Sequence, residues 1–387
     1  MTIKRFLCAA LICALASTAT VSYAKKGGNG GGNGGGGGED PPPEPPPTVS
    51  YSIEILPTLG GDSSAAYGMN GDGDVVGLSY TEVSGSRSWP HGFHYDYQTQ
   101  TVIDLHDLFV VEGLLDGLPY GPIEYDTETG WVVTAADDIN DSGQIIGTIR
   151  LAENGIGTET FQFRYTPATA TTPSFIQEIL PLVEGDAVTL KAINNVGLVV
   201  GYALGEDGLE HPVAWSEPFD ETTGSGGTID LGIYNEQSTI PNDVNDFGEL
   251  CGSLNTNPRA WRLDAAGYLN LGKLQKGKWG SSEARSINNL GEVAGSSTLS
   301  TVTRRAFIYD DANGMQDLGT LGGSSSWGGY LNDNGEVVGN SHTAGDEVSH
   351  AFLHSGGAMI DIEDSIPGFA GSVYYELLEP KGITNSG

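Results

Sequence analysis

The sequence contains few cysteines and few basic residues. Of its 3 cysteines, Cys8 and Cys13 lie near the N-terminus. Beyond them only Cys251 remains, so the rest of the chain cannot form an internal disulfide. The 17 Lys and Arg stand against 50 Asp and Glu, which gives a formal net charge of -33. Neutralising phosphates requires clustered Lys and Arg, so nucleic acid and anionic membrane surfaces are disfavoured as partners.

Long apolar runs are scarce, and the only one stands at the N-terminus. Lys4 and Arg5 precede an apolar stretch from Phe6 to Ala16, and small residues lead up to Ala24. This pattern predicts a signal peptide over residues 1–24 and a secreted, extracellular chain, with the periplasm or the cell surface as alternatives. No second run of membrane-spanning length follows, so we expect no membrane span after cleavage.

Glycine and proline are concentrated directly behind this segment. Residues 25–48 are rich first in glycine and then in proline. They predict a disordered linker, with a flexible coil leading into a stiff polyproline II segment. Such a linker tethers a folded module, although a linker with no further role fits equally well. A repeat domain is predicted over residues 51–387.

One phrase recurs seven times in that domain: an apolar residue, Asn, two variable residues, Gly, one variable residue, two mostly apolar residues and Gly. Its turn glycines stand at 73, 143, 197, 248, 291, 335 and 387, close to the spacing of propeller repeats. Asn caps its own turn and Gly supplies a positive φ, so each phrase predicts a β-hairpin. The residues predicted to build these turns are Asn70, Gly73, Asn140, Gly143, Asn194, Gly197, Asn245, Gly248, Asn288, Gly291, Asn332 and Gly335.

Two further strands follow each hairpin. In the last full unit they are centred on His350-Ala351-Phe352 and Ile360-Asp361-Ile362. Four short strands per unit predict an all-β fold, a β-propeller of four-stranded blades with six complete blades and a partial seventh. The alternatives are a six-bladed ring and a β-solenoid. The segments 51–56 and 375–384 resemble a fourth and a first strand, so we expect the seventh blade to be incomplete and the domain to be truncated at its C-terminus.

Three phrases resemble the HAF family of bacterial extracellular repeat proteins. They are Leu318-Gly319-Thr320-Leu321-Gly322-Gly323, the Asn-x-x-Gly-x-apolar-apolar-Gly turn, and His350-Ala351-Phe352. The resemblance extends from Tyr51 to the last residue and weakens in the third strands of the second, third and fourth units. It implies a secreted repeat protein and transfers no catalytic residue.

Variable connections between the strands are where we expect a ligand to bind. The Asn-x-x-Gly turns are short and uniform, so their face of the propeller is expected to be structural. The opposite face carries the longer segments, above all His106 to Val133, and variable loops on a rigid scaffold usually hold the binding site. Aromatic side chains there predict a glycan-binding surface, while packing under their own loops is the competing interpretation. The candidate ligand-binding residues are Trp89, Tyr120, Tyr125 and Trp131.

A calcium site is a second possibility. Asn70, Asp72 and Asp74 offer oxygen atoms at alternating positions of one turn, as loop cation sites do. The bidentate Glu that usually completes such a loop is missing, and hairpin chemistry alone explains the motif. We therefore expect no cofactor, with calcium as the alternative.

The sequence favours binding over catalysis. It has no Ser elbow and no phosphate loop. Its histidines fall mostly at equivalent places beside third strands, which indicates a scaffold role. We expect a monomeric, non-catalytic binding module for a glycan or another extracellular polymer or surface component. A propeller hydrolase or lyase acting on polysaccharide remains the alternative.

Overall fold

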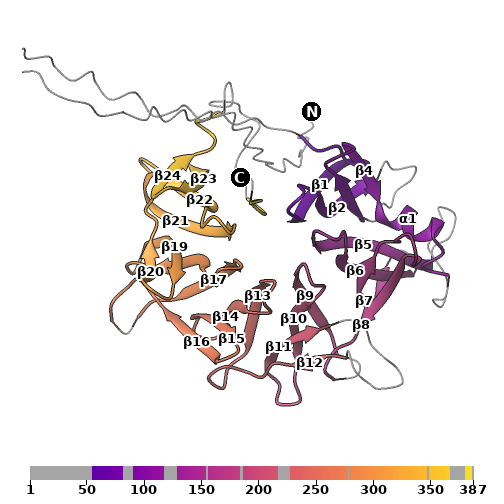
Figure 1. Cartoon of the computed structure of the whole chain (residues 1–387), viewed down its shortest axis with the longest axis horizontal. Helices are drawn as coiled ribbons and strands as arrows, with labels where there is room; N and C mark the ends of the chain where they lie inside the picture. Colours follow the sequence, from indigo (N-terminus) through magenta and orange to yellow (C-terminus); the bar gives the residue numbers. More distant parts are fainter. Residues whose placement is uncertain are drawn as a thin grey trace, which may run out of the picture.

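The computed structural model describes residues 55–81, 90–116, 129–153, 156–183, 186–216, 227–277, 279–346, 348–366 and 380–385. Within these ranges the chain forms six four-stranded sheets, each an antiparallel meander in sequence order. The sheets stand side by side in a ring (Figure 1). The prediction of an all-β propeller with six complete four-stranded blades is confirmed. The predicted signal peptide and linker lie outside the described residues.

The blades follow one another along the chain. The first three are β1 (Gly60–Met69), β2 (Val75–Thr81), β3 (Pro90–Asp96) and β4 (Thr101–Asp104), then β5 (Thr129–Ile139), β6 (Ile145–Glu153), β7 (Ile156–Thr166) and β8 (Phe175–Ile179), then β9 (Val188–Ile193), β10 (Val199–Leu204), β11 (Glu210–Trp215) and β12 (Ile229–Asp230). The last three are β13 (Thr239–Val244), β14 (Leu250–Leu254), β15 (Ala260–Asp264) and β16 (Gly267–Gly272), then β17 (Ser282–Ile287), β18 (Val293–Thr298), β19 (Arg304–Asp310) and β20 (Gly314–Asp317), then β21 (Gly322–Leu331), β22 (Val337–Thr343), β23 (Ser349–Ser355) and β24 (Ala358–Asp361).

A short helix, α1 (Leu105–Val111), follows β4 in the segment expected to be a loop. Asp104 caps it by accepting hydrogen bonds from the backbone N–H groups of His106 and Asp107. Leu105 and Phe109, four residues apart, are fully buried. Two turns are too short to show a helical period in the sequence, which is why the pattern did not predict this helix.

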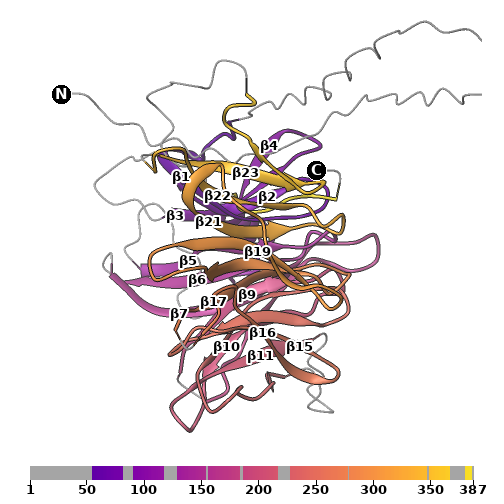
Figure 2. The same cartoon turned by 90° about the vertical axis from the view of Figure 1, so that its left-hand side faces the viewer.

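The first strand of each blade faces the middle of the ring and the fourth lies outermost (Figure 1). Figure 2, turned by 90°, shows neighbouring sheets lying face to face. Apolar side chains fill the space between them. One such cluster joins Val200 and Ala214 of the third blade to Leu250 and Trp261 of the fourth. Stability therefore comes from burial between sheets rather than from one central core.

A β-bulge interrupts the first strand of every blade at the same place. In β1 the pairing passes from Ala66 opposite Gly77 to Gly68 opposite Val76, so no residue of β2 stands opposite Tyr67. A bulge of this kind re-aims one side chain. The six bulge residues are Tyr67, Asp137, Lys191, Asn242, Arg285 and Gly329.

The last glycine of the repeat phrase permits this bulge. A Cβ atom at Gly252 would lie 2.0 Å from the carbonyl oxygen of Ile240, and at Gly77 it would lie 1.9 Å from that of Ala65. No side chain fits at such distances, so only Gly lets the two strands approach. The third-strand aromatic covers the vacant space, as Trp261 does opposite Gly252.

The seventh position of the ring lies between β21 and β1. Residues 380–385 occupy it: Asn332 Nδ2 donates to the backbone oxygen of Thr384, and Gly382 lies against Met69. The partial seventh blade was predicted to contribute strands at 51–56 and 375–384. Over their described residues, 55–56 and 380–384, neither segment is a strand, because neither pairs in a ladder there. That part of the prediction is corrected.

Candidate functional site

The aromatic candidates do not form a surface among the described residues. Trp89, Tyr120 and Tyr125 lie outside the described ranges. Trp131, in β5, is only 5% exposed, and its ring centroid lies 5.2 Å from that of Phe161. Trp131 therefore packs within its own blade, which is the competing interpretation given above.

Two of the three calcium candidates, Asn70 and Asp74, form hydrogen bonds with the protein backbone. Asn70 Oδ1 accepts hydrogen bonds from the backbone N–H groups of Asp72 and Asp74. Asp74 Oδ1 accepts from the N–H of Tyr97, and its Oδ2 lies 3.3 Å from His94 Nε2. Burial raises the pKa of Asp74, but these hydrogen bonds and the His94 charge lower it more, so the pKa lies below its ordinary value. Turn chemistry thus accounts for Asn70 and Asp74, while Asp72 is exposed to solvent.

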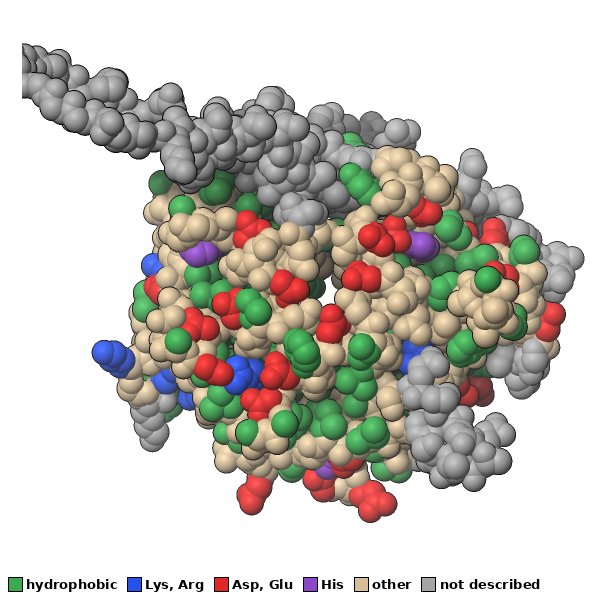
Figure 3. Space-filling view, viewed as in Figure 1, with side chains coloured by type: hydrophobic (Ala, Val, Ile, Leu, Met, Phe, Trp, Pro, Cys, Tyr) green, Lys and Arg blue, Asp and Glu red, His purple; other side chains and the backbone are tan. Residues whose placement is uncertain are grey.

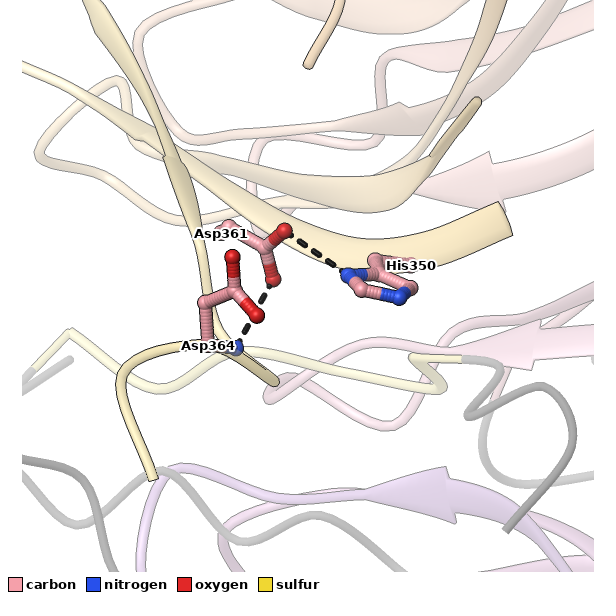
Figure 4. Close-up of side chains that lie close together, drawn as sticks. All are labelled: His350, Asp361 and Asp364. Atoms are coloured by element: carbon pink, nitrogen blue, oxygen red, sulfur yellow. Dashed lines mark hydrogen bonds and ion pairs between the residues drawn. The ribbon is translucent and has the colours of Figure 1, made fainter. Parts of the chain in front are cut away.

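A second group with metal-ligating side chains is His350, Asp361 and Asp364 (Figure 4). His350 Nδ1 lies 2.8 Å from Asp361 Oδ2, and Asp361 Oδ1 accepts from the backbone N–H of Asp364. The same pair of third-strand His and fourth-strand Asp recurs as His91 with Asp104, at 2.7 Å. The pair links the two outer strands and caps the following turn, so the scaffold explains this group.

The repeated asparagines have a second role that the sequence did not reveal. In the fourth blade, Asn245 Oδ1 caps its own turn by accepting from the N–H groups of Phe247 and Glu249. Its Nδ2 donates to Asn288 O in the next blade, at 2.9 Å. The equivalent bond links each of the six blades to the following turn of the ring. The phrase therefore builds each hairpin and also joins it to its neighbour.

The residue after each repeated asparagine from Asn140 onward, together with Asn385, forms what we call the Asp–Asn belt; Gly71 takes this place after Asn70. Carboxylate and amide side chains alternate along the belt, and the amides of Asn195 and Asn289 each bridge the carboxylates on either side. Asn289 Nδ2 donates to Asp246 Oδ2 at 3.0 Å and to Asp333 Oδ2 at 3.2 Å. The alternation keeps the carboxylates from facing one another directly. The members of the belt are Asp141, Asn195, Asp246, Asn289, Asp333 and Asn385.

A cavity of about 640 Å³ occupies the middle of the ring, and the Asp–Asn belt surrounds its mouth. The space-filling view shows the hollow, with Asp and Glu side chains around it (Figure 3). Five bulge residues line the cavity: Tyr67, Asp137, Lys191, Asn242 and Arg285. We call this space the central cavity. It opens on the face of the Asn-x-x-Gly turns, which we expected to be only structural.

The Asn and Gly positions of the repeat phrase are uniform in the six complete blades, whereas the bulge residues differ in every blade. They present a phenol, a carboxylate, an ammonium, an amide and a guanidinium to one space. Sequence reasoning missed them because each looks like an ordinary strand residue. The available signal was their register: each stands three residues before the repeated Asn.

Charged groups in the central cavity have shifted pKa values. Burial raises the pKa of Asp137 to about 6, against a hydrogen bond from Thr148 and the charge of Lys191. Burial and then the charge of Arg285 hold the pKa of Lys191 below its ordinary value. The charged bulge residues of different blades therefore interact electrostatically.

Two buried carboxylates beside the cavity make folding depend on pH. Asp138 accepts from the N–H of Ile193, and Asp243 accepts from that of Ile287, each in the following blade. Burial raises their pKa values to about 7 and about 6. Between pH 4 and these values the folded chain holds protons that the unfolded chain has released, so this contribution to stability is full at low pH and is lost as pH rises.

We therefore expect Asp243→Asn to gain stability relative to the unsubstituted protein as pH rises from 4 to 7, by about 2 kcal/mol. The amide oxygen still accepts from Ile287 N–H, but it cannot ionise. Urea unfolding at several pH values measures the difference. Asp62→Asn, at an exposed position, is the control and should leave the pH dependence unchanged. A difference between Asp243→Asn and the unsubstituted protein that is constant with pH would contradict the assignment.

No helix in the described part of the chain combines the length and apolar character needed to cross a membrane.

Comparisons with known proteins support the fold and do not identify a function. No family model matches the sequence, and no curated protein matches it. Among solved structures the chain is similar to TolB from Acinetobacter baumannii, at 13% identity over 74% of this chain and 68% of that one, with a TM-score of 0.35. It is also similar to the β-propeller domain of the Trilobed protease from Pyrococcus furiosus, at 12% identity over 79% and 98%, TM-score 0.37. Dipeptidyl peptidase 4 from Porphyromonas gingivalis matches at 8% identity over 74% and 50%, TM-score 0.42. At these identities the likeness concerns the fold alone.

Proposed function

We propose that this chain is an exported, non-catalytic binding module that holds an extracellular glycan in its central cavity. The resemblance to the HAF family, the export signal and the monomeric state belong to the same proposal. One observation carries it: the scaffold repeats, while the side chains that the bulges turn into the central cavity do not. A repeat that only supported the ring would have no reason to turn five different polar groups into one cavity.

The chemistry of the bulge residues suits a sugar. Hydroxyl groups both donate and accept hydrogen bonds, and the Asn242 amide offers both partners. Tyr67, which is 37% exposed, combines an apolar ring face with a polar tip. A polar cavity of this volume is large enough for a few sugar units.

We expect the double variant Tyr67→Ala, Asn242→Ala to bind the glycan at least about tenfold more weakly. A tenfold loss corresponds to about 1.4 kcal/mol of binding free energy, which the loss of two contacting side chains readily exceeds. A glycan array followed by titration with the retained oligosaccharide measures it. Tyr80→Ala is the matched control, because Tyr80 is 39% exposed and lies outside the cavity lining. Unchanged retention by the double variant, with loss on deletion of residues 114–128, would move the site to the loops.

A polysaccharide hydrolase or lyase is the second candidate. The observation that favours it is Asp137, because a carboxylic acid with a pKa of about 6 suits general acid–base catalysis near neutral pH. Product released from a polysaccharide by the unsubstituted protein, and not by Asp137→Asn, would establish catalysis. Retention of polymer without product would support the binding module.

A further inference from the structure

Two of the cations that line the central cavity stand on bulges, in a protein that has few basic residues. Lys191 and Arg285 are two of the 17 basic residues in a chain of net charge -33. They occupy the bulges of β9 and β17, in the third and fifth blades, and both line the cavity. Nothing in the repeat requires a cation there, because the same position holds Tyr67, Asp137 and Asn242 elsewhere.

Several other arginines of the described chain are neutralised in ion pairs. Arg262 pairs with Asp264 and Asp311, and Arg304 pairs with Glu283 at 3.2 Å. By contrast, Arg285 is exposed in the cavity, and within the described ranges it forms no ion pair. Lys191 Nζ lies over the ring of Tyr202, 5.7 Å from its centroid. Both cations thus keep a charge that no described carboxylate neutralises in a direct ion pair.

The two cations line the same cavity, and their charges act on each other. The charge of Arg285 lowers the pKa of Lys191, while that of Asp137 raises it. Like charges held near one another disfavour both charged forms, and a bound anion relieves that repulsion. Lys381, from the seventh position of the ring, lines the same cavity.

We propose that Lys191 and Arg285 form an oxyanion-binding site that takes a carboxylate or sulfate group of an acidic glycan. This inference rests on the proposed function and adds the ligand class. A guanidinium matches such a group with two parallel hydrogen bonds, and an ammonium adds a point charge. Tyr67 and Asn242 then contact the neutral hydroxyl groups of the adjoining sugars.

The Asp–Asn belt narrows the ligand class further. Its carboxylates surround the mouth through which the ligand enters. A polymer with a charge on every sugar would place anions beside them, whereas an acidic sugar flanked by neutral sugars places its one anion beside the cations. At physiological ionic strength the remaining surface charge is screened beyond about 8 Å. The site therefore suits a glycan with isolated acidic units.

The test uses a trisaccharide with one glucuronate between two neutral sugars, and the methyl ester of the same trisaccharide. We expect the unsubstituted full chain to bind the acid at least about tenfold more tightly than the ester by calorimetry. Lys191→Gln and Arg285→Gln should each reduce that ratio, and Arg285→Lys should restore part of it. Lys273→Gln removes a charge outside the cavity lining and should leave the ratio unchanged.

A second probe separates this inference from the proposed function. Sodium sulfate, compared with chloride at equal ionic strength, should raise the Tm of the unsubstituted protein and of Lys273→Gln more than that of Arg285→Gln, which keeps only the general stabilisation by sulfate. Equal binding of acid and ester would overturn the oxyanion site and leave glycan binding intact. Sulfate stabilisation that depends on Arg285, with neither trisaccharide bound, would support the oxyanion site and overturn the glycan. Failure of both probes would overturn both.

Discussion

Replacing Gly252 with Ala is expected to lower the free energy of unfolding by about 3 kcal/mol, the upper end of what an overpacked core usually costs. The new Cβ would lie 2.0 Å from Ile240 O and 2.5 Å from Trp261 Cζ2. The first is a backbone atom, so it cannot turn away as a side chain would. Relief requires the first strand to move and the bulge at Asn242 to open.

Chemical unfolding of the full chain measures this loss. Gly208→Ala is the control, because a Cβ there meets nothing within 4 Å although φ is +77°. Its cost should be about 1 kcal/mol, from backbone strain alone. If Gly252→Ala is no more harmful than Gly208→Ala, the close approach of the two strands does not determine the fold at this position.

Replacing Asn245 with Asp is expected to cost about 3 kcal/mol at pH 7, although the two side chains have the same shape. The amide donates to Glu249 Oε2 at 2.7 Å and to Asn288 O at 2.9 Å, and Asn245 is only 4% exposed. A carboxylate loses both donors and places a negative charge beside two acceptors, in a site with little solvent.

Thermal and urea unfolding, with Asn235→Asp as the control, check this prediction. Asn235 is exposed, and no hydrogen bond of its side chain is found among the described residues, so its change should have little effect. Equal stability of the two variants would mean that the bonds between blades add nothing to the turn itself.

Both variants act on the scaffold that positions the central cavity. The repeated Gly allows the bulge, and the repeated Asn ties each bulged strand to the next blade. Either change should also weaken ligand binding, because the bulge residues of neighbouring blades must keep their spacing. A matched loss of stability and affinity in Gly252→Ala would link the repeat phrase to function.

Much of the fold was predictable because the sequence signals that determine it lie within a few residues of one another. An Asn followed by Gly closes a hairpin whatever surrounds it, and an apolar pair such as Val199-Val200 then forms a strand. Counting these signals gave the six blades and the order of their strands. The sequence did not predict the helix after Asp104 or the non-strand conformation of 380–384, since the first is too short for periodicity and the second depends on what lies beside it.

The candidate site was not predictable in the same way. The sequence drew attention to Trp131, which the structure buries, and passed over Asp137, Lys191 and Arg285. A side chain's direction at a bulge depends on the register between two strands. The meeting of three such side chains depends on closure of the ring. Neither property belongs to any short stretch of residues.

The sequence by itself determined the repeating hairpin, the four-strand unit and the alternation of Asp and Asn after the repeated Asn from Asn140 onward. These follow from turn geometry and hydrogen bonding within a few residues, so no distant contact is needed to fix them. Tertiary structure alone decided that the variable residues of five separate strands share one cavity, and that the amide of one blade holds the backbone of the next. The reason is that both depend on residues at least 43 positions apart, which only packing around the ring brings together.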